Sequence, residues 1–187
     1  MASQVLFVIL DIPSKGKGVV ATQDISPGTL LLEEKPLISI NKAIALASDI
    51  AEAFNTLSQQ QQKDAFMRLA SAHGQDPARH PYAGSLEFSE EHRGRRRRQE
   101  YANARIAEEK SLLSIYITNA IAIGDSTTSS AVFESISRFN HECVPNACFS
   151  WDEDKEVESV YAISEIKAGE VCFVRSNLSL ELVKPNC

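Results

Sequence analysis

The chain has 187 residues, of which 43% are hydrophobic and 24% charged, and these proportions exclude a disordered or collagen-like polypeptide. Its formal net charge of −6 argues against broad, sequence-independent nucleic-acid binding, because such binding needs a net basic surface. The longest apolar run covers residues 5–10, far short of the roughly 20 residues that cross a bilayer, and no basic residue precedes it as in a signal peptide. We therefore expect a single-domain protein that is intracellular, either cytoplasmic or nuclear.

The first 40 residues are typical of β-strands separated by turns. Residues 5–10 form a β-type run, and shorter strands are predicted at 19–22 and 29–34. The sequence Ser26-Pro27-Gly28 predicts the turn between the last two strands.

Between residues 41 and 121 apolar residues recur at helical spacing, which predicts a block of helices. The first helix is expected to begin at Asn41, and Ser58 with Gln61 forms a capping box for a second. After a loop, a third helical stretch opens with four arginines at 95–98 and runs to about residue 121. The arginines could form a nuclear-import or phosphate-binding patch, but we favour a solvated helix face paired with nearby glutamates.

Strands resume after the helical block. Alternating polar and apolar residues predict strands at 147–151 and 157–163, with a hairpin loop at 152–154 between them, and a last strand is expected at 171–174. No internal repeat stands out.

All four cysteines lie in the last quarter of the chain, at Cys143, Cys148, Cys172 and Cys187. No pair has the C-x-x-C spacing of a self-contained zinc site, so we expect no zinc and no other bound metal. Because no secretory signal is apparent, we favour reduced, buried thiols over two disulfides.

Two segments together resemble a SET domain. The segment GKGVVATQDISPGTLLLEEKPL (16–37) resembles the opening of the family, with its Gly-x-Gly turn, and SRFNHECVPNACFSW (137–151) is similar to the Asn-His-x-Cys-x-Pro-Asn signature. The segment VYAISEIKAGEVCF (160–173) then looks like the strand and turn that follow the signature. The helical block falls where the split-SET subfamily carries an insertion, and the chain resembles fungal-type members that lack the post-SET segment.

This resemblance implies an α+β fold, namely a β-rich SET-like core with knot-like threading of the C-terminal signature and a helical insertion. The single domain would comprise N-terminal SET strands at 1–40, the helical insertion at 41–121, the C-terminal SET core at 131–177 and a short tail at 178–187.

Family members bind S-adenosylmethionine in one cleft and admit the substrate lysine from the opposite face. The resemblance places Gly16, Lys17 and Gly18 beside the methionine part of this cofactor, and Asn140 and His141 beside the adenosine. Glycines let a backbone approach a ligand closely, and an asparagine side chain offers both a donor and an acceptor. The glycines alone would equally indicate a tight turn, and Asn140 with His141 could be a buried hydrogen-bonded pair.

The sequence departs from the family in two places. Active members usually end the last strand on a tyrosine whose hydroxyl orients the amine, whereas no tyrosine follows Tyr161 here. Phe173 stands about where that tyrosine is expected, and Arg175 adds a fixed positive charge nearby. Many members also continue into a cysteine-rich segment that holds zinc, and the short tail after residue 177 has no C-x-C-x-x-C sequence.

From these departures we favour a degenerate SET protein that transfers no methyl group to lysine. Its groove would bind and shape a small, largely apolar substrate, for example in a biosynthetic cyclisation or isomerisation, or hold a protein partner. An S-adenosylmethionine-dependent protein-lysine N-methyltransferase is the alternative, and a non-catalytic protein-binding module is a further one. On the favoured interpretation no cofactor is required, although S-adenosylmethionine could bind, and no membrane is a partner. Candidate groove residues are Tyr116, Tyr161, Phe173 and Arg175.

Overall fold

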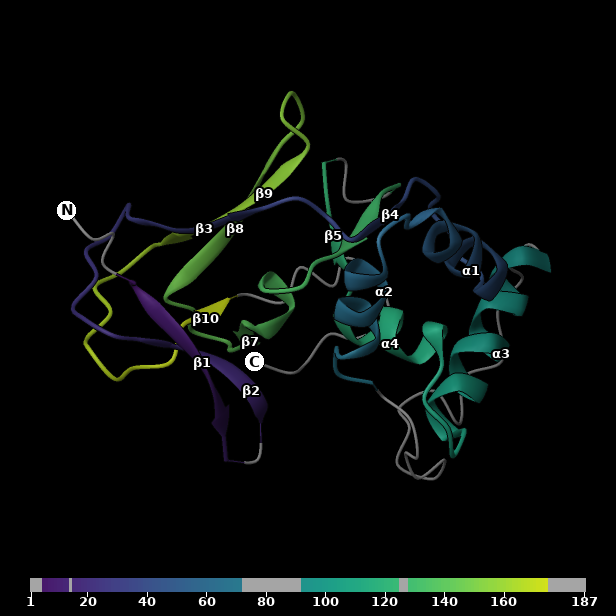
Figure 1. Ribbon diagram of the computed structural model, residues 1–187, viewed down its shortest axis with the longest axis horizontal. Coiled ribbons are helices and arrows are strands. Elements are labelled where there is room, and N and C mark those ends of the chain that lie inside the picture. The colour runs from purple at the N-terminus through teal and green to yellow at the C-terminus, as the bar shows by residue number, and fades with distance from the viewer. Residues whose placement is uncertain (1–4, 14, 72–91, 125–127, 175–187) are drawn as a thin grey trace. The chain divides into compact units, whose positions relative to one another are not determined.

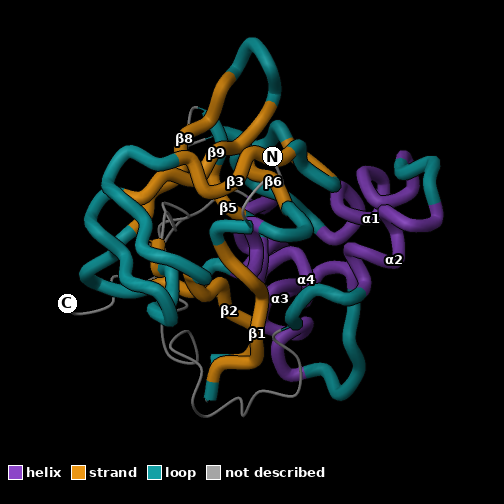
Figure 2. The backbone as a smooth tube through the Cα atoms, turned by 60° about the vertical axis from the view of Figure 1, so that its left-hand side comes forward, coloured by secondary structure: helices purple, strands orange, loops and turns teal. Residues whose placement is uncertain are grey.

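The computed structural model describes residues 5–13, 15–71, 92–124 and 128–174. The chain forms two compact units. Unit 1 comprises residues 1–36, 122–124 and 133–187, and unit 2 comprises residues 37–121 and 125–132. All four described α-helices belong to unit 2, whereas the described part of unit 1 consists of strands, loops and one 3₁₀ turn (Figures 1 and 2). The mixture of sheets and helices confirms the expected α+β class.

Unit 1 contains a two-stranded and a five-stranded sheet. The two-stranded sheet pairs β1 (Phe7–Ile12) with β2 (Gly16–Ala21), and the five-stranded sheet has the order β3 (Leu30–Glu34), β9 (Val157–Ala162), β8 (Ala147–Asp152), β10 (Phe173–Val174) and β7 (Asn140–His141). Strand β10 runs parallel to both β7 and β8, while β3, β9 and β8 are antiparallel. The strands predicted near residues 5–34 and 147–174 are therefore present, with bounds shifted by one to three residues.

The hairpin of β8 and β9 contributes buried residues to the core of unit 1. Its register runs without a break from Ala147 opposite Ala162 to Asp152 opposite Val157, and Val160 is fully buried. The connecting turn includes Glu156 in a left-handed conformation (φ 54°). The predicted hairpin loop thus lies a residue or two later than expected.

A short internal repeat joins the two halves of unit 1, and the expectation of no repeat was wrong. Residues 21–29 (ATQDISPGT) and 162–170 (AISEIKAGE) share the pattern Ala-x-x-acidic-Ile-x-x-Gly. Ile25 and Ile166 exchange both backbone hydrogen bonds, at 2.8 and 3.0 Å. Each glycine adopts a positive φ, 82° at Gly28 and 87° at Gly169, which a side chain would strain. Each glycine also donates its N–H to the alanine carbonyl of the other copy, so the two turns hold one another.

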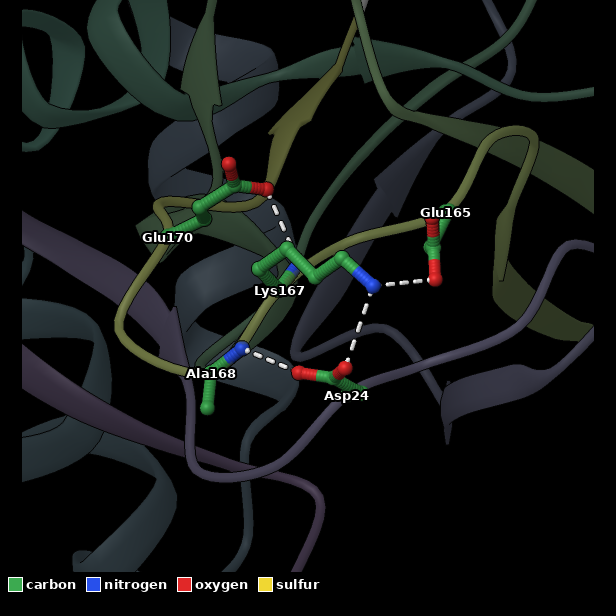
Figure 3. A network of polar contacts seen from close by, with 5 residues as sticks. All are labelled: Asp24, Glu165, Lys167, Ala168 and Glu170. Atoms are coloured by element: carbon green, nitrogen blue, oxygen red, sulfur yellow. Dashed lines mark hydrogen bonds and ion pairs between the residues drawn. The ribbon is translucent and has the colours of Figure 1, made fainter.

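The two copies differ at one backbone position, and the difference explains a cluster of ion pairs (Figure 3). The N–H of Ala168 donates to Asp24 at 3.0 Å, whereas the matching residue of the first copy is Pro27, which has no N–H to offer Glu165. The Lys167 ammonium group interacts with Glu165 instead of the missing N–H, and it also contacts Asp24. The Ala168 N–H and the Lys167 ammonium both lower the pKa of Asp24.

Unit 2 is a helical cluster with a small sheet. It contains α1 (Ala47–Thr56), α2 (Gln60–Met67), α3 (His92–Ile106) and α4 (Leu112–Asn119). The sheet order is β4 (Ile38–Ile40), β6 (Ser130–Val132) and β5 (Ile121–Ala122), and of β5 only Ile121 is counted in unit 2. Its core residues, each at most 2% exposed, include Ile50, Phe66, Leu69, Ile115 and Tyr116. The amphipathic pattern was therefore interpreted correctly as a block of helices.

The helix starts differ from the prediction in several places. The capping box predicted from Ser58 and Gln61 is not formed, because α2 begins at Gln60 after the N-cap residue Gln59, and no side chain caps it. The first helix begins at Ala47 rather than Asn41, where the Asp49 carboxylate accepts the Leu46 N–H at 2.8 Å. The single helix expected from residue 95 to 121 is two helices, because the hydroxyl of Ser111 accepts the N–H of Ser114 and starts α4. The short strands β4, β5 and β6 were not predicted, since two or three residues carry no measurable alternation.

Candidate functional site

The structure brings the Gly-x-Gly segment, which begins strand β2 and is not itself a turn, into direct contact with the Asn-His segment within unit 1. The Nδ2 group of Asn140 donates a hydrogen bond to the Lys17 carbonyl at 3.2 Å. A Cβ atom at Gly18 would lie 2.6 Å from that Nδ2 and 2.5 Å from Cγ1 of Ile12. A side chain at this position would require Asn140 and Ile12 to shift. The second glycine of the motif is therefore needed for packing as well as for any ligand.

Gly16 has a different role from Gly18. It begins β2 with a φ of 72°, and nothing lies within 4 Å of the place where its Cβ would be. Its backbone is open to a ligand, while its conformation favours glycine over any other residue. The two glycines thus combine an exposed backbone edge at Gly16 with close packing at Gly18.

The strand β7 holds Asn140 and His141 against β10. Phe173 pairs with Asn140 and Val174 with His141 in parallel register, and the Glu142 N–H donates to the Val174 carbonyl at 3.1 Å. The protein around the imidazole disfavours its charged form and lowers the pKa of His141, although part of the residue is open to solvent. His141 is therefore neutral at pH 7 and offers one donor and one acceptor.

Asn146, the last residue of the signature, fixes β10 through its side chain. Its Oδ1 accepts the Phe173 N–H at 2.7 Å, and its Nδ2 donates to the Val171 carbonyl at 2.9 Å. Its backbone N–H adds a third bond, to the Phe173 carbonyl at 3.1 Å. The sequence analysis quoted Asn146 within the motif without giving it a role. An asparagine has no spacing signal that distinguishes such a clamp from a surface side chain.

Lys15 is a second residue that the sequence analysis did not single out. Its Nζ lies 4.4 Å from the centroid of the Phe173 ring and 3.0 Å from Oε2 of Glu142. An ammonium group over an aromatic face is an attractive arrangement, worth about 0.5–1 kcal/mol at an exposed site. The face of Phe173 therefore already holds a lysine side chain of the same chain.

The four groove candidates are divided between the two units and the residues outside the described part of the chain. Tyr116 belongs to unit 2, where it is 2% exposed and its hydroxyl lies 2.5 Å from Oγ of Ser130. Burial raises the pKa of Tyr116. Tyr161 lies on β9 and Phe173 on β10 of unit 1, and Arg175 lies outside the described residues. Tyr116 is thus placed as a core residue of the helical unit.

The residues around Gly18 fit a cofactor that carries hydrogen-bonding groups and a carboxylate. Within the described part of the chain, Oδ1 of Asn140 has no hydrogen-bond partner and remains an acceptor. Lys15 and Lys17 flank Gly16 with two ammonium groups, which pair with Glu142 at 3.0 Å and with Asp11 at 2.8 Å. Amide, imidazole and ammonium groups suit an adenosine and an amino-acid carboxylate. The chemistry of this donor set agrees with the S-adenosylmethionine site implied by the sequence.

The described cysteines do not form a metal-binding group. Cys148 and Cys172 are free thiols, and burial raises the pKa of Cys172 to about 11, so this thiol is unreactive at neutral pH. Cys143 is disulfide-bonded, which differs from the expected reduced thiol. Across the residues that the structure describes, no group of three or more His, Cys, Asp or Glu side chains could hold a metal ion. Over the same residues, no helix combines the length and apolarity needed to cross a membrane.

The comparisons with known proteins agree with the motif. A family model described as SET domain matches residues 16–173. A Schizosaccharomyces pombe protein named histone-lysine N-methyltransferase set5 is 28% identical over 165 residues, which is 88% of this chain and 40% of that protein. A SET domain-containing protein of Acanthamoeba polyphaga mimivirus is 28% identical over 163 residues, 85% of this chain and 62% of that protein. The chain therefore spans less than two thirds of the length of each relative.

One solved structure matches over most of this chain. It is ctPRC2 in an autoinhibited conformation bound to S-adenosylmethionine, and the match covers 94% of this chain and 16% of that chain. The TM-score is 0.49 and the sequence identity 14%.

Proposed function

Since the chain belongs to the SET domain family, as its motifs predicted, we propose that it is an S-adenosylmethionine-dependent protein-lysine N-methyltransferase. The observation that carries the proposal is the contact between Gly18 and Asn140, which joins the two cofactor segments of the family although they lie more than 100 residues apart. The name of the yeast relative supports the same activity. This proposal replaces the degenerate scaffold favoured from the sequence, for which the comparisons offer no support.

Different residues would bind the cofactor and attract the substrate lysine. Gly16 offers an open backbone, Asn140 an unused carbonyl oxygen, and His141 a neutral imidazole. When bound, S-adenosylmethionine supplies the methyl group. The aromatic face of Phe173 attracts the ammonium group of an incoming lysine, as it now attracts that of Lys15.

A non-methylating SET scaffold remains a second candidate because of one specific observation. Phe173 has no hydroxyl, so it orients no amine lone pair, and Lys15 already covers its ring. One missing hydrogen-bonding group at a reaction centre lowers the rate by roughly 10²-fold or more. On this candidate the cofactor site would bind S-adenosylmethionine without methyl transfer.

The test separates binding from transfer. Isothermal titration calorimetry with S-adenosylmethionine measures the first, and transfer of a radiolabelled methyl group to purified histones and to lysine-bearing peptides measures the second. Asn140→Ala should abolish both, while the matched control Asn103→Ala, on an exposed face of α3, should change neither. Binding without transfer would support the scaffold, and no binding by a folded protein would contradict both candidates.

We also propose that the two units together form a single SET-like domain, with the helices of unit 2 as its insertion, and that the protein acts inside the cell. Thermal unfolding tests the first point, because a single domain should unfold in one transition with or without the cofactor. Imaging of a fluorescent fusion tests the second.

A further inference from the structure

A hollow of about 390 Å³ lies on one face of the five-stranded sheet, apart from the residues of the candidate cofactor site. Glu33, Ser159 and Ser150 lie side by side across β3, β9 and β8 in the strand register. Tyr161 and Asp152 lie two residues further along β9 and β8 and therefore share this face. Trp151 and the turn of the hairpin complete the lining. All of these residues belong to unit 1.

The lining is strongly acidic and contains one cation. Four carboxylates line the hollow, those of Glu33, Asp152, Glu153 and Asp154, against the single ammonium group of Lys155. Lys155 contacts Asp152 at 3.0 Å, and this hydrogen bond together with the charge of Glu33 raises the pKa of Lys155. The hollow therefore already attracts one cationic side chain and retains excess negative charge.

A mostly buried serine provides a second, independent sign of a ligand. Ser159 lines the hollow and is only 4% exposed, and among the described residues its hydroxyl has no hydrogen-bond partner. This hydroxyl keeps a small solvent-accessible surface, so it is available to a donor that enters the hollow. Tyr161 and Trp151 add aromatic surface, and a guanidinium group stacks well on such surface.

We propose that this hollow docks an arginine side chain of a basic protein segment. The planar guanidinium would donate to Glu33 and to the Ser159 hydroxyl and lie against Tyr161. Arginine suits the site better than lysine, because it offers five donors in a fixed plane where lysine offers one compact charge. Docking involves neither the cofactor nor methyl transfer, so the inference goes beyond the proposed function and stands or falls separately.

Trp151 makes the proposal directly measurable, because it is the single tryptophan of the chain and lines the hollow. The probe is the acetylated peptide Gly-Arg-Gly-Ser-Arg-Gly-Ser-Arg-Gly, titrated without S-adenosylmethionine at low salt while tryptophan fluorescence is followed. We expect a saturable change in fluorescence. The same peptide with citrulline in place of arginine should produce none, because citrulline keeps the shape and loses the charge.

Three variants distinguish a specific site from general attraction to an acidic protein. Glu33→Gln should weaken binding about threefold, and Lys155→Met should strengthen it by a similar factor because a competing cation is removed. Glu165→Gln is the matched control: it removes the same charge from unit 1, outside the hollow, and should change the affinity little. Equal weakening by Glu33→Gln and Glu165→Gln, or equal binding of the citrulline peptide, would overturn the proposal.

Discussion

The two sites on unit 1 are built in opposite ways. The candidate cofactor site depends on close packing at its centre, since a side chain at Gly18 would overlap Asn140. The hollow on β3, β9 and β8 is open and depends on charge, with four carboxylates around one ammonium group. Packing at the first site requires particular residues in a fixed order, whereas many acidic sequences would produce the second. The first site was accordingly visible in the sequence and the second was not.

The largest expected effect is a pH dependence of folding stability that arises from a buried carboxyl group on the face of the sheet opposite the hollow. Glu158 is next to Ser159 in β9, is 1% exposed, and burial raises its pKa to about 7. The folded protein therefore keeps a proton on Glu158 that the unfolded chain releases above about pH 4.5. Folding stability should fall as the pH rises from about 4.5 to about 7, by about 3 kcal/mol in total.

Urea unfolding at a series of pH values measures this effect. In Glu158→Gln that fall should be absent, because the substituted amide does not titrate. Glu33→Gln, an exposed carboxylate on the neighbouring strand, is the control and should retain the pH dependence of the original protein. A Glu158→Gln variant with the same pH dependence would show that another group is responsible.

The next effect concerns the clamp behind the cofactor site. Asn146→Ala leaves the Phe173 N–H and the Val171 carbonyl without their side-chain partners, and each lost bond costs about 1 kcal/mol. We expect a loss of about 2 kcal/mol in the free energy of unfolding, measured by urea denaturation. S-adenosylmethionine affinity should also fall, because β10 holds β7 in register. Asn103→Ala should leave both quantities unchanged, and a similar loss there would point to a general effect of removing an amide.

Close packing at the first site leads to the third prediction. Gly18→Ala should lower stability by about 1–2 kcal/mol, because the added methyl group overlaps Asn140 and Ile12. S-adenosylmethionine affinity should drop at least tenfold, as measured by calorimetry. The double variant Gly18→Ala/Asn140→Ala should regain part of the lost stability, since the contact with Nδ2 is gone. Strictly additive losses of stability would mean that a side chain at position 18 does not clash with Asn140.

The sequence predicted unit 1 better than unit 2, for physical reasons. Six-residue strands such as β8 and β9 are long enough to give a readable pattern, whereas the strands β4, β5 and β6 have only two or three residues each. The break between α3 and α4 depends on the Ser111 cap, which the apolar pattern does not reveal.

Contacts between residues far apart in the chain were also not predicted from the residue pattern. The Gly18 and Asn140 segments were paired only through their family resemblance. The repeat at residues 21–29 and 162–170 is short and interrupted, and its meaning lies in hydrogen bonds between copies. The hollow has no sequence signal at all, because its residues come from three strands whose register is fixed only by folding.

The smallest expected effect concerns the lysine of the protein that lies at each site, and the interactions of the two lysines differ. Lys155 pairs with carboxylates in the hollow, whereas Lys15 has one carboxylate, Glu142, and the face of Phe173. Lys15→Met removes an exposed ion pair and a cation–π contact, so stability should fall by at most about 1 kcal/mol. The uncovered Phe173 ring would then be open to a lysine from another chain.

A lysine-bearing peptide should therefore bind Lys15→Met about two- to threefold more tightly than the original protein in a fluorescence anisotropy titration. Lys17→Met removes an equal charge two residues away, where the ammonium pairs with Asp11, and should produce no such gain. An equal gain in both variants would mean that only the net charge matters, and the Phe173 face would then have no part in admitting lysine.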